Sequence, residues 1–225
     1  MKLKSLPFAL SSVAALVLIY GCGGSTVVSG DKNPRARAVD LLATPATVSV
    51  TIDGIAVAGA STFGSVSVYA LYNNGNREVI FKDATTNGTL IDQSPLFELN
   101  HFYTCIGYVS AAGPALMVLS DGGNVAADQT QIRFGKAAAG TTASVDVYVT
   151  TPGVDLNTVT PTFSGVTLGA TNVPYVAFQA GSYEVRETPT GSKVPFDDQT
   201  LTFGGGVNTT LLDQGTSTYL ALTDQ

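Results

Sequence analysis

The sequence predicts an all-β protein in which two tandem antiparallel β-sandwich domains follow a signal peptide and a flexible tether. Three observations predict this fold. Charged residues make up only 12% of the 225-residue chain, about half the usual share, while β-branched residues and glycine are abundant. Apolar residues alternate with polar ones in short runs, a period of two that is typical of strands. The second part of the chain also repeats the pattern of the first part.

Residues 1–21 have the pattern of a bacterial signal peptide. Lys2 and Lys4 precede a mostly apolar run that ends at Gly21, and Cys22 follows directly. A basic start, a short apolar segment and a small residue before the break are typical of a secretory signal rather than of a membrane span. The end of this run resembles the lipobox of bacterial lipoproteins, which implies cleavage before Cys22 and lipidation of its thiol. An ordinary signal peptide with an incidental Cys22 is the alternative.

Residues 22–36 are predicted to be the lipidated N-terminus and a flexible tether, since they are rich in Gly, Ser and other small or polar residues. A coil of that length spans roughly 20 Å. Gly23 stands where an Asp commonly retains lipoproteins at the inner membrane, so the resemblance implies the outer membrane. We therefore expect a protein of the cell envelope whose membrane partner is reached through lipidated Cys22.

The chain after the tether reads as two copies of one unit. We place the first β-sandwich repeat at 37–121, a linker at 122–131 and the second repeat at 132–225. The firmest match aligns Tyr69–Val79 with Tyr175–Val185 without a gap. Other matched segments are Arg37 with Arg133, Val48–Ile52 with Val145–Val149, Asp92-Gln93 with Asp198-Gln199, and Leu116–Asp121 with Tyr219–Asp224. The spacing changes only across Gly/Thr/Asn/Pro-rich stretches, as expected for loops.

Each repeat contains about seven short strand candidates, separated by turn residues such as Asp53-Gly54. Seven alternating strands at this spacing favour an immunoglobulin-like antiparallel sandwich. The Cys pair and core Trp of immunoglobulin domains are absent, so the strand topology stays open. In the first repeat the expected strands lie at 37–43, 47–53, 65–72, 77–83, 95–100, 102–110 and 115–120. Cys105 lies within one of these apolar strands, which predicts a buried and inert thiol.

Several short segments resemble the bacterial domain of unknown function family 4397. They include the start Ala36-Arg37-Ala38-Val39-Asp40, the end of a strand at Ile52-Asp53-Gly54, and the blocks Val145–Val149 and Gly181–Val185. The resemblance covers about 37–225. It implies an all-β extracytoplasmic module, sometimes found in tandem, and supplies no catalytic residues.

The charge of the chain excludes some classes of partner. Cleavage removes only Lys2 and Lys4 from the 11 basic residues, so the mature charge is 9 − 17 = −8. An acidic chain without a Lys/Arg cluster argues against nucleic acid as a partner. Cys105 is the only thiol left once Cys22 is lipidated, so no intrachain disulfide is expected and stability must come from packing.

Reactive clusters are scarce, and we expect no catalytic residues, no metal and no cofactor. His101 is the only histidine and falls at a hairpin corner, without a Gly-x-Ser-x-Gly nucleophile motif elsewhere and without the ligands that zinc requires. The oxygen-rich segment 121–128 joins the repeats and leaves calcium as an alternative to a plain linker. A hydrolase that uses carboxylates such as Asp197 or Glu184 is an alternative to a non-enzymatic protein.

Nine aromatic residues recur in the strands, and most of them are explained by core packing. Tyr148 and Tyr183 align with the polar residues Thr51 and Asn76, so they are the better candidates for exposure and ligand binding. The leading hypothesis is a lipid-anchored binding or structural protein whose partner is an unknown envelope protein or glycan. A carbohydrate-binding module is an alternative.

Overall fold

The computed structural model describes residues 32–140, 142–215 and 218–225. The predicted signal peptide, Cys22 and most of the predicted tether lie outside these residues. The described part is built of strands, and its one short helical turn is the 3-10 helix η1 (Leu156–Thr158). Within it, no helix has the length and the apolar composition needed to cross a membrane.

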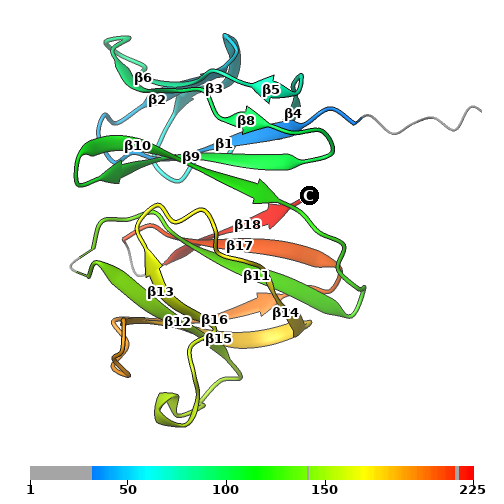
Figure 1. The fold of residues 1–225 in the computed structure, drawn as a ribbon. Helices are drawn as coiled ribbons and strands as arrows, with labels where there is room; N and C mark the ends of the chain where they lie inside the picture. The colour runs from blue at the N-terminus through cyan, green and yellow to red at the C-terminus, as the bar shows by residue number, and fades with distance from the viewer. Residues whose placement is uncertain (1–31, 141, 216–217) are drawn as a thin grey trace, which may run out of the picture. The chain divides into compact units, whose positions relative to one another are not determined.

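The N-terminal half of the described chain contains two four-stranded sheets and a two-stranded ribbon (Figure 1). One sheet has the order β10-β9-β1-β4, the other has the order β3-β2-β6-β7, and β5 pairs with β8. The strands are β1 (Arg35–Leu41), β2 (Val48–Ile52), β3 (Ile55–Ser61), β4 (Ala70–Leu71), β5 (Gly75–Asn76), β6 (Val79–Asp83), β7 (Thr89–Gln93), β8 (Leu96–Phe97), β9 (Phe102–Ser110) and β10 (Gly113–Asp121).

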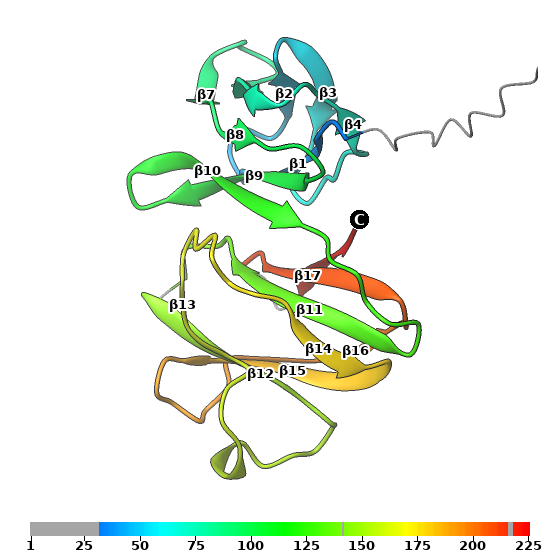
Figure 2. The ribbon, with the colours of Figure 1, turned by 45° about the vertical axis from the view of Figure 1, so that its right-hand side comes forward.

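The C-terminal half contains two further four-stranded sheets (Figure 2). Their orders are β14-β11-β17-β18 and β13-β12-β15-β16. The strands are β11 (Gln129–Lys136), β12 (Ser144–Thr150), β13 (Phe163–Thr167), β14 (Val176–Gln179), β15 (Gly181–Pro189), β16 (Asp197–Phe203), β17 (Val207–Asp213) and β18 (Tyr219–Asp224). Strand for strand, these orders repeat those of the N-terminal half, in which β5 and β8 have no counterpart.

The strand order, which the sequence left open, differs from that of the immunoglobulin domains that the strand spacing favoured, and the expected purely antiparallel pairing is wrong. In an immunoglobulin domain the first strand pairs with the second, and the second with the fifth. Here β1 lies between β4 and β9, and β11 lies between β14 and β17. Both β1–β9 and β11–β17 are parallel pairs, so these sheets are mixed rather than antiparallel. Side-chain alternation identifies the buried face of a strand but not the direction of its neighbour, which explains the difference.

Three strands of the N-terminal half are absent from the sequence prediction: β3, β7 and the two-residue β5. Asp53 and Gly54 both have positive φ, of 51° and 74°, as a two-residue hairpin turn requires. This turn leads from β2 directly into β3. β3 is rich in Ala and Gly and only partly covered, so it lacks the large apolar residues that mark a strand. The second missed strand, β7, has a single fully buried residue, Ile91.

Three apolar clusters form the core. The first fills the space between the two sheets of the N-terminal half, and the second fills the corresponding space in the C-terminal half. The third joins the halves, because Val39 and Leu41 of β1 pack in the same cluster as Leu212 and Leu222. Within β1, Ala36 and Ala38 face the first cluster while Val39 and Leu41 face the third, so this strand is covered on both sides. Cys105 is fully buried in the first cluster, as expected, and its burial raises the pKa of its thiol.

Candidate functional site

Tyr148, one of the two predicted ligand-binding residues, is buried. Its side chain is 1% exposed, so the expectation that it is exposed is wrong. The Lys193 ammonium lies 4.7 Å from the centre of the Tyr148 ring and donates a hydrogen bond to the carbonyl of Val159 at 2.6 Å. Lys193 thus covers the outer face of β12, where alternation alone predicts contact with solvent.

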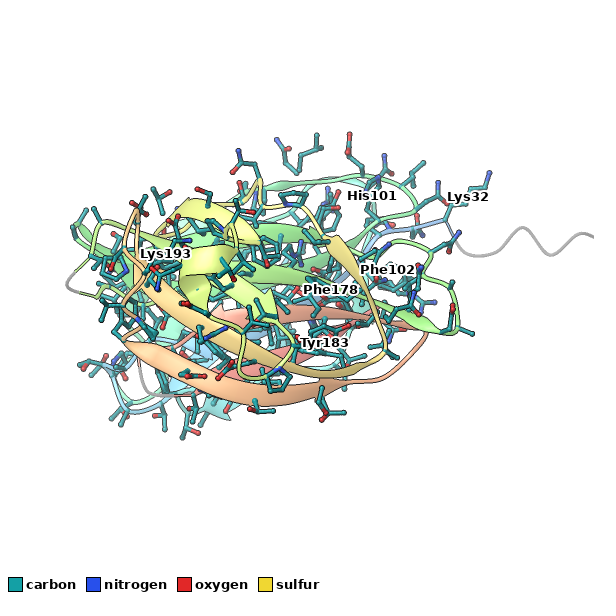
Figure 3. All side chains as sticks on the ribbon, turned by 90° about the horizontal axis from the view of Figure 1, so that it is seen from below. Lys32, His101, Phe102, Phe178, Tyr183 and Lys193 are labelled. Carbon is teal, nitrogen blue, oxygen red and sulfur yellow. The ribbon has the colours of Figure 1, made fainter. Side chains whose placement is uncertain are left out.

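Tyr183, the other predicted ligand-binding residue, is half-buried at the start of β15. Its ring packs edge-on against Phe178, with 5.3 Å between ring centres, and its hydroxyl donates to the Gln179 carbonyl at 2.9 Å. Figure 3 shows Phe178 and Tyr183 close together and far from Lys193, so the two predicted tyrosine sites are separate. Tyr183 is therefore largely engaged by its own neighbours.

The hydrolase candidates Glu184 and Asp197 lie on the adjacent strands β15 and β16, and Asp198 is a direct neighbour of Glu184: burial and the Glu184 carboxylate raise the pKa of Asp198. Glu184 accepts a hydrogen bond from the Gly153 amide at 3.0 Å and pairs with Arg186 at 3.4 Å. Asp92 and Asp198 are exposed, whereas Asp197 is half-buried. Adjacent residues of a strand point to opposite faces, so Asp197 faces the interior of the sandwich together with Leu201 and Phe203.

The two aspartates of the 121–128 segment are not arranged together as calcium ligands. Asp121 is buried and accepts hydrogen bonds from three protein side chains, described below, while Asp128 is exposed. Within the part of the chain that the structure describes, no three His, Cys, Asp or Glu side chains are grouped so that they could hold a metal ion.

A buried arginine of each half binds the last aspartate of the other half. Arg37 in β1 pairs with Asp224 in β18, and its other groups donate to the Thr104 hydroxyl at 2.9 Å and to the Thr223 carbonyl at 2.8 Å. The guanidinium also lies 4.6 Å from the centre of the Tyr69 ring. We call these residues the Arg37 cluster.

Arg133 makes the corresponding contacts with the two halves exchanged, and we call these residues the Arg133 cluster. Arg133 in β11 pairs with Asp121 in β10 at 2.6 Å, and donates to the Thr210 hydroxyl at 2.7 Å and to the Ser120 carbonyl at 2.8 Å. Its guanidinium lies 4.5 Å from the centre of the Tyr175 ring.

Each aspartate also accepts hydrogen bonds from its own half. Asp121 accepts from Tyr69 at 2.9 Å and from Thr104, while Asp224 accepts from Tyr175 and Thr210, both at 2.6 Å. Burial, reinforced by the nearby Asp224, raises the pKa of Asp121 although Arg133 opposes this shift. The two clusters form a reciprocal, fully hydrogen-bonded link between the halves.

A third buried ionic group lies inside the C-terminal half alone. The Lys136 ammonium is 3.1 Å from Oδ2 of Asp213 and 3.7 Å from Oε1 of Glu187. All three side chains are buried, with Lys136 2% exposed and Glu187 not exposed at all. Among the described residues, neither oxygen of Glu187 has a hydrogen-bond partner. Burial, together with the Asp213 carboxylate, raises the pKa of Glu187 to about 8, although the Lys136 ammonium opposes this shift.

The sheet register explains why these three residues meet. Lys136 and Asp213 are direct partners of the parallel β11–β17 pair, while Glu187 enters from β15 in the opposite sheet. Lys136 shares the inward face of β11 with Ile132 and Phe134, and Asp213 shares that of β17 with Leu211. We call Lys136, Asp213 and Glu187 the buried triad.

The same positions in the N-terminal half are filled differently. Asp40 and Gly107 are the corresponding partners in the parallel β1–β9 pair, and Phe81 of β6 stands where Glu187 stands in β15. A Cβ atom added to Gly107 would lie 2.6 Å from the Phe81 ring. The ring therefore fills the space that the triad fills in the other half.

Sequence reasoning did not identify the buried triad. The available signal was a charged residue on an inward-facing position: Lys136 falls two residues after Phe134, and Glu187 two residues after Val185. Lys, Glu and Asp are almost never fully buried unless paired. A charged residue on an inward-facing position therefore indicates a buried ionic group, but that position can be recognised only when the strand is correctly placed.

A known protein family matches the part of the chain that contains both buried arginines. The model of the family described as "Domain of unknown function (DUF4397)" matches residues 34–148, which is more than half of the chain. The chain belongs to the DUF4397 family. The matched segment begins just before β1 and ends within β12, so it includes Arg37, Arg133 and Lys136. Asp213 and Glu187 lie beyond the segment that the DUF4397 model matches.

Other comparisons add little to the DUF4397 membership. No curated protein matches this chain. Among solved structures, a match is the crystal structure of CBMbc, of family CBM26, from Eubacterium rectale Amy13K in complex with maltoheptaose. It is 12% identical, with 80% of this chain and 92% of that chain covered, at a TM-score of 0.24.

Proposed function

We propose that this protein is a non-enzymatic, lipid-anchored protein of the bacterial cell envelope, with a binding or structural role and two tandem copies of one β-sandwich domain. The reciprocal Arg37 and Arg133 clusters carry the structural part of this proposal. A buried charge is costly unless it is paired and hydrogen-bonded, and both arginines are paired across the halves. Such paired charges suit two domains that are held together as one rigid unit.

The copy relationship is supported by position as well as by sequence. Arg37 and Arg133, Tyr69 and Tyr175, and Asp121 and Asp224 are the residue pairs that the sequence alignment matched, and each pair makes corresponding contacts. The strand orders of the two halves also correspond. The shared topology differs from the immunoglobulin order, so the proposed unit is an eight-stranded mixed sandwich.

The non-enzymatic part is supported by what the carboxylates do. Asp121, Asp224, Glu184 and Asp213 each bind a neighbouring residue of the same chain. Asp92 and Asp198 are exposed at separate sheet positions, opposite Ile80 and Arg186. Glu184 and Asp198 are neighbours, but Glu184 is already bound by the Gly153 amide and by Arg186.

The anchor is tested by labelling cells with a fatty acid whose incorporation into the protein can be followed. We expect label in the wild type and in Cys105→Ser, and none in Cys22→Ser, because Cys22 carries the lipid. In a host with two membranes, Gly23→Asp should move the protein from the outer-membrane to the inner-membrane fraction. Labelling of Cys22→Ser, or an N-terminal peptide that begins before residue 22, would contradict the anchor.

A further inference from the structure

We propose that Lys136 and Asp213 become joined by an intramolecular amide bond, which the protein forms by itself with Glu187 as the neighbouring acid–base group. The product is a covalent cross-link between β11 and β17, the first and the penultimate strand of the C-terminal half. This inference is independent of lipidation and of any external partner.

The geometry places the reacting groups side by side. Lys136 and Asp213 are register partners on adjacent parallel strands, and the Lys136 Nζ lies 3.1 Å from Oδ2 of Asp213. The other oxygen, Oδ1, accepts a hydrogen bond from the Gly215 amide at 2.7 Å, which fixes the plane of the carboxyl group. The hydrogen bond to Oδ2 keeps the Lys136 nitrogen beside Cγ of Asp213, the carbon to which that oxygen is bonded. Holding two groups together in this way removes much of the entropic barrier to their reaction.

The step is a condensation that loses one water molecule. A proton moves from the Lys136 ammonium to the Asp213 carboxylate along their hydrogen bond, which yields a neutral amine and a neutral acid. The amine lone pair then forms a bond to Cγ of Asp213. Glu187 accepts a proton from the nitrogen and gives its own proton to the departing hydroxyl, which leaves as water. Glu187 returns to its initial state, and no oxidant, reductant or co-reactant is needed.

The surroundings favour this chemistry. Lys136 and Glu187 are within the apolar interior of the sandwich, where neutral groups are preferred over charged ones. Burial and the neighbouring Asp213 and Asp197 raise the pKa of Glu187, so it holds the proton that the leaving hydroxyl requires. Tyr219, whose ring belongs to the second apolar cluster, is also buried. The same exclusion of water protects the finished amide from hydrolysis.

A purely structural role explains the buried triad less well. At the corresponding positions the N-terminal half packs the Phe81 ring over Gly107, so an apolar filling of this space exists within the same protein. Replacing a buried ionic group by apolar residues is often neutral or stabilising. Neither oxygen of the buried Glu187 has a hydrogen-bond partner among the described residues. Burying such a group lowers the stability of the fold, but its position suits proton transfer.

Peptide mapping of the full-length protein, purified from its host, tests the proposal. Trypsin cannot cleave after an acylated lysine, so we expect one branched product in which peptide 134–186 is joined to peptide 194–225, one water lighter than their sum. Recovery of a separate peptide 137–186 as the main product would overturn the proposal. A branch to peptide 187–193 would also overturn it, because the bond would then involve Glu187 rather than Asp213.

Four variants complete the test. Lys136→Arg, Asp213→Ala and Glu187→Gln should each lack the branched peptide, whereas Asp40→Ala, at the equivalent position of the N-terminal half, should retain it. Glu187→Gln keeps the shape of the side chain, and its far-ultraviolet circular dichroism should match that of the wild type. A branched peptide in folded Glu187→Gln would contradict the role of Glu187. The wild-type map remains decisive even if a variant fails to fold.

Discussion

At the scale of the residue, the molecule depends on charges that are buried and paired. The side chains of Arg37 and Arg133 are 6% and 3% exposed, and their aspartate partners are fully covered. Each guanidinium also donates to a threonine hydroxyl and a carbonyl oxygen, so its planar set of donors is used in several directions. Removing one arginine leaves a buried carboxylate without its counter-charge.

Arg133→Met is therefore expected to destabilise the protein by about 3–5 kcal/mol, the usual cost of removing one partner of a buried pair. Arg77→Met is the matched control, because Arg77 pairs with Asp53 at 2.8 Å with side chains that are 23% and 33% exposed. This pair is much more exposed than the Arg133 pair, and pairs at the surface contribute only about 0–1 kcal/mol. Urea unfolding followed by circular dichroism measures both. Equal losses in the two variants would show that the Arg133 cluster adds no special stability.

At the scale of the element, the β10-β9-β1-β4 sheet of the N-terminal half has a glycine where the opposite sheet has an aromatic ring. Gly107 of β9 lies beneath Phe81 of β6, and the Phe81 ring is fully buried. The ring cannot move into solvent, because it is enclosed by the first apolar cluster. The distance between the two sheets at this point depends on the missing side chain.

Gly107→Ala is expected to cost about 1–3 kcal/mol, the range for overpacking a filled core. Gly59→Ala in β3 is the control, since a Cβ atom there would meet nothing within 4 Å, and it should change stability by no more than about 0.5 kcal/mol. Thermal unfolding of both variants is the measurement. A Gly107→Ala protein as stable as Gly59→Ala would mean that Phe81 can shift at little cost.

The sequence predicted individual strands better than their arrangement. Strict alternation placed β2 at 47–53 and matched it to Val145–Val149, and the structure has strands at Val48–Ile52 and Ser144–Thr150. The parallel partner of β1 was not predictable, because alternation carries no information on direction. Tyr148 shows a second limit, since a lysine more than forty residues further along the chain covers it. The buried triad shows a third, because its residues meet only through register.

At the scale of the whole molecule, stability should depend on pH through acids with raised pKa values. Among the carboxyl groups of the described residues, Glu187 has its pKa raised to about 8, and Lys136, Asp213, Asp197 and Tyr219 face it. Burial, the main cause, persists if Asp213 is consumed by an amide. An acid whose pKa is raised by folding keeps its proton in the folded state at pH values where the unfolded chain has lost it.

The free energy of unfolding should therefore fall as pH rises from the ordinary Glu value of 4.5 to about 8, and the contribution of Glu187 should then be constant. The slope from one group is at most about 1.4 kcal/mol for each pH unit. Glu187→Gln should flatten this dependence. Urea unfolding across the pH range measures it, and an equal slope in wild type and Glu187→Gln would assign the dependence to other groups.

The parallel pairing of β1 with β9 has a mechanical consequence. Seven consecutive residues, from Arg35 to Leu41, have partners in β9, and the chain enters β1 directly from the N-terminal segment. Tension transmitted from that segment acts on β1 first, and β1 can leave the sheet only when its seven pairings with β9 are lost.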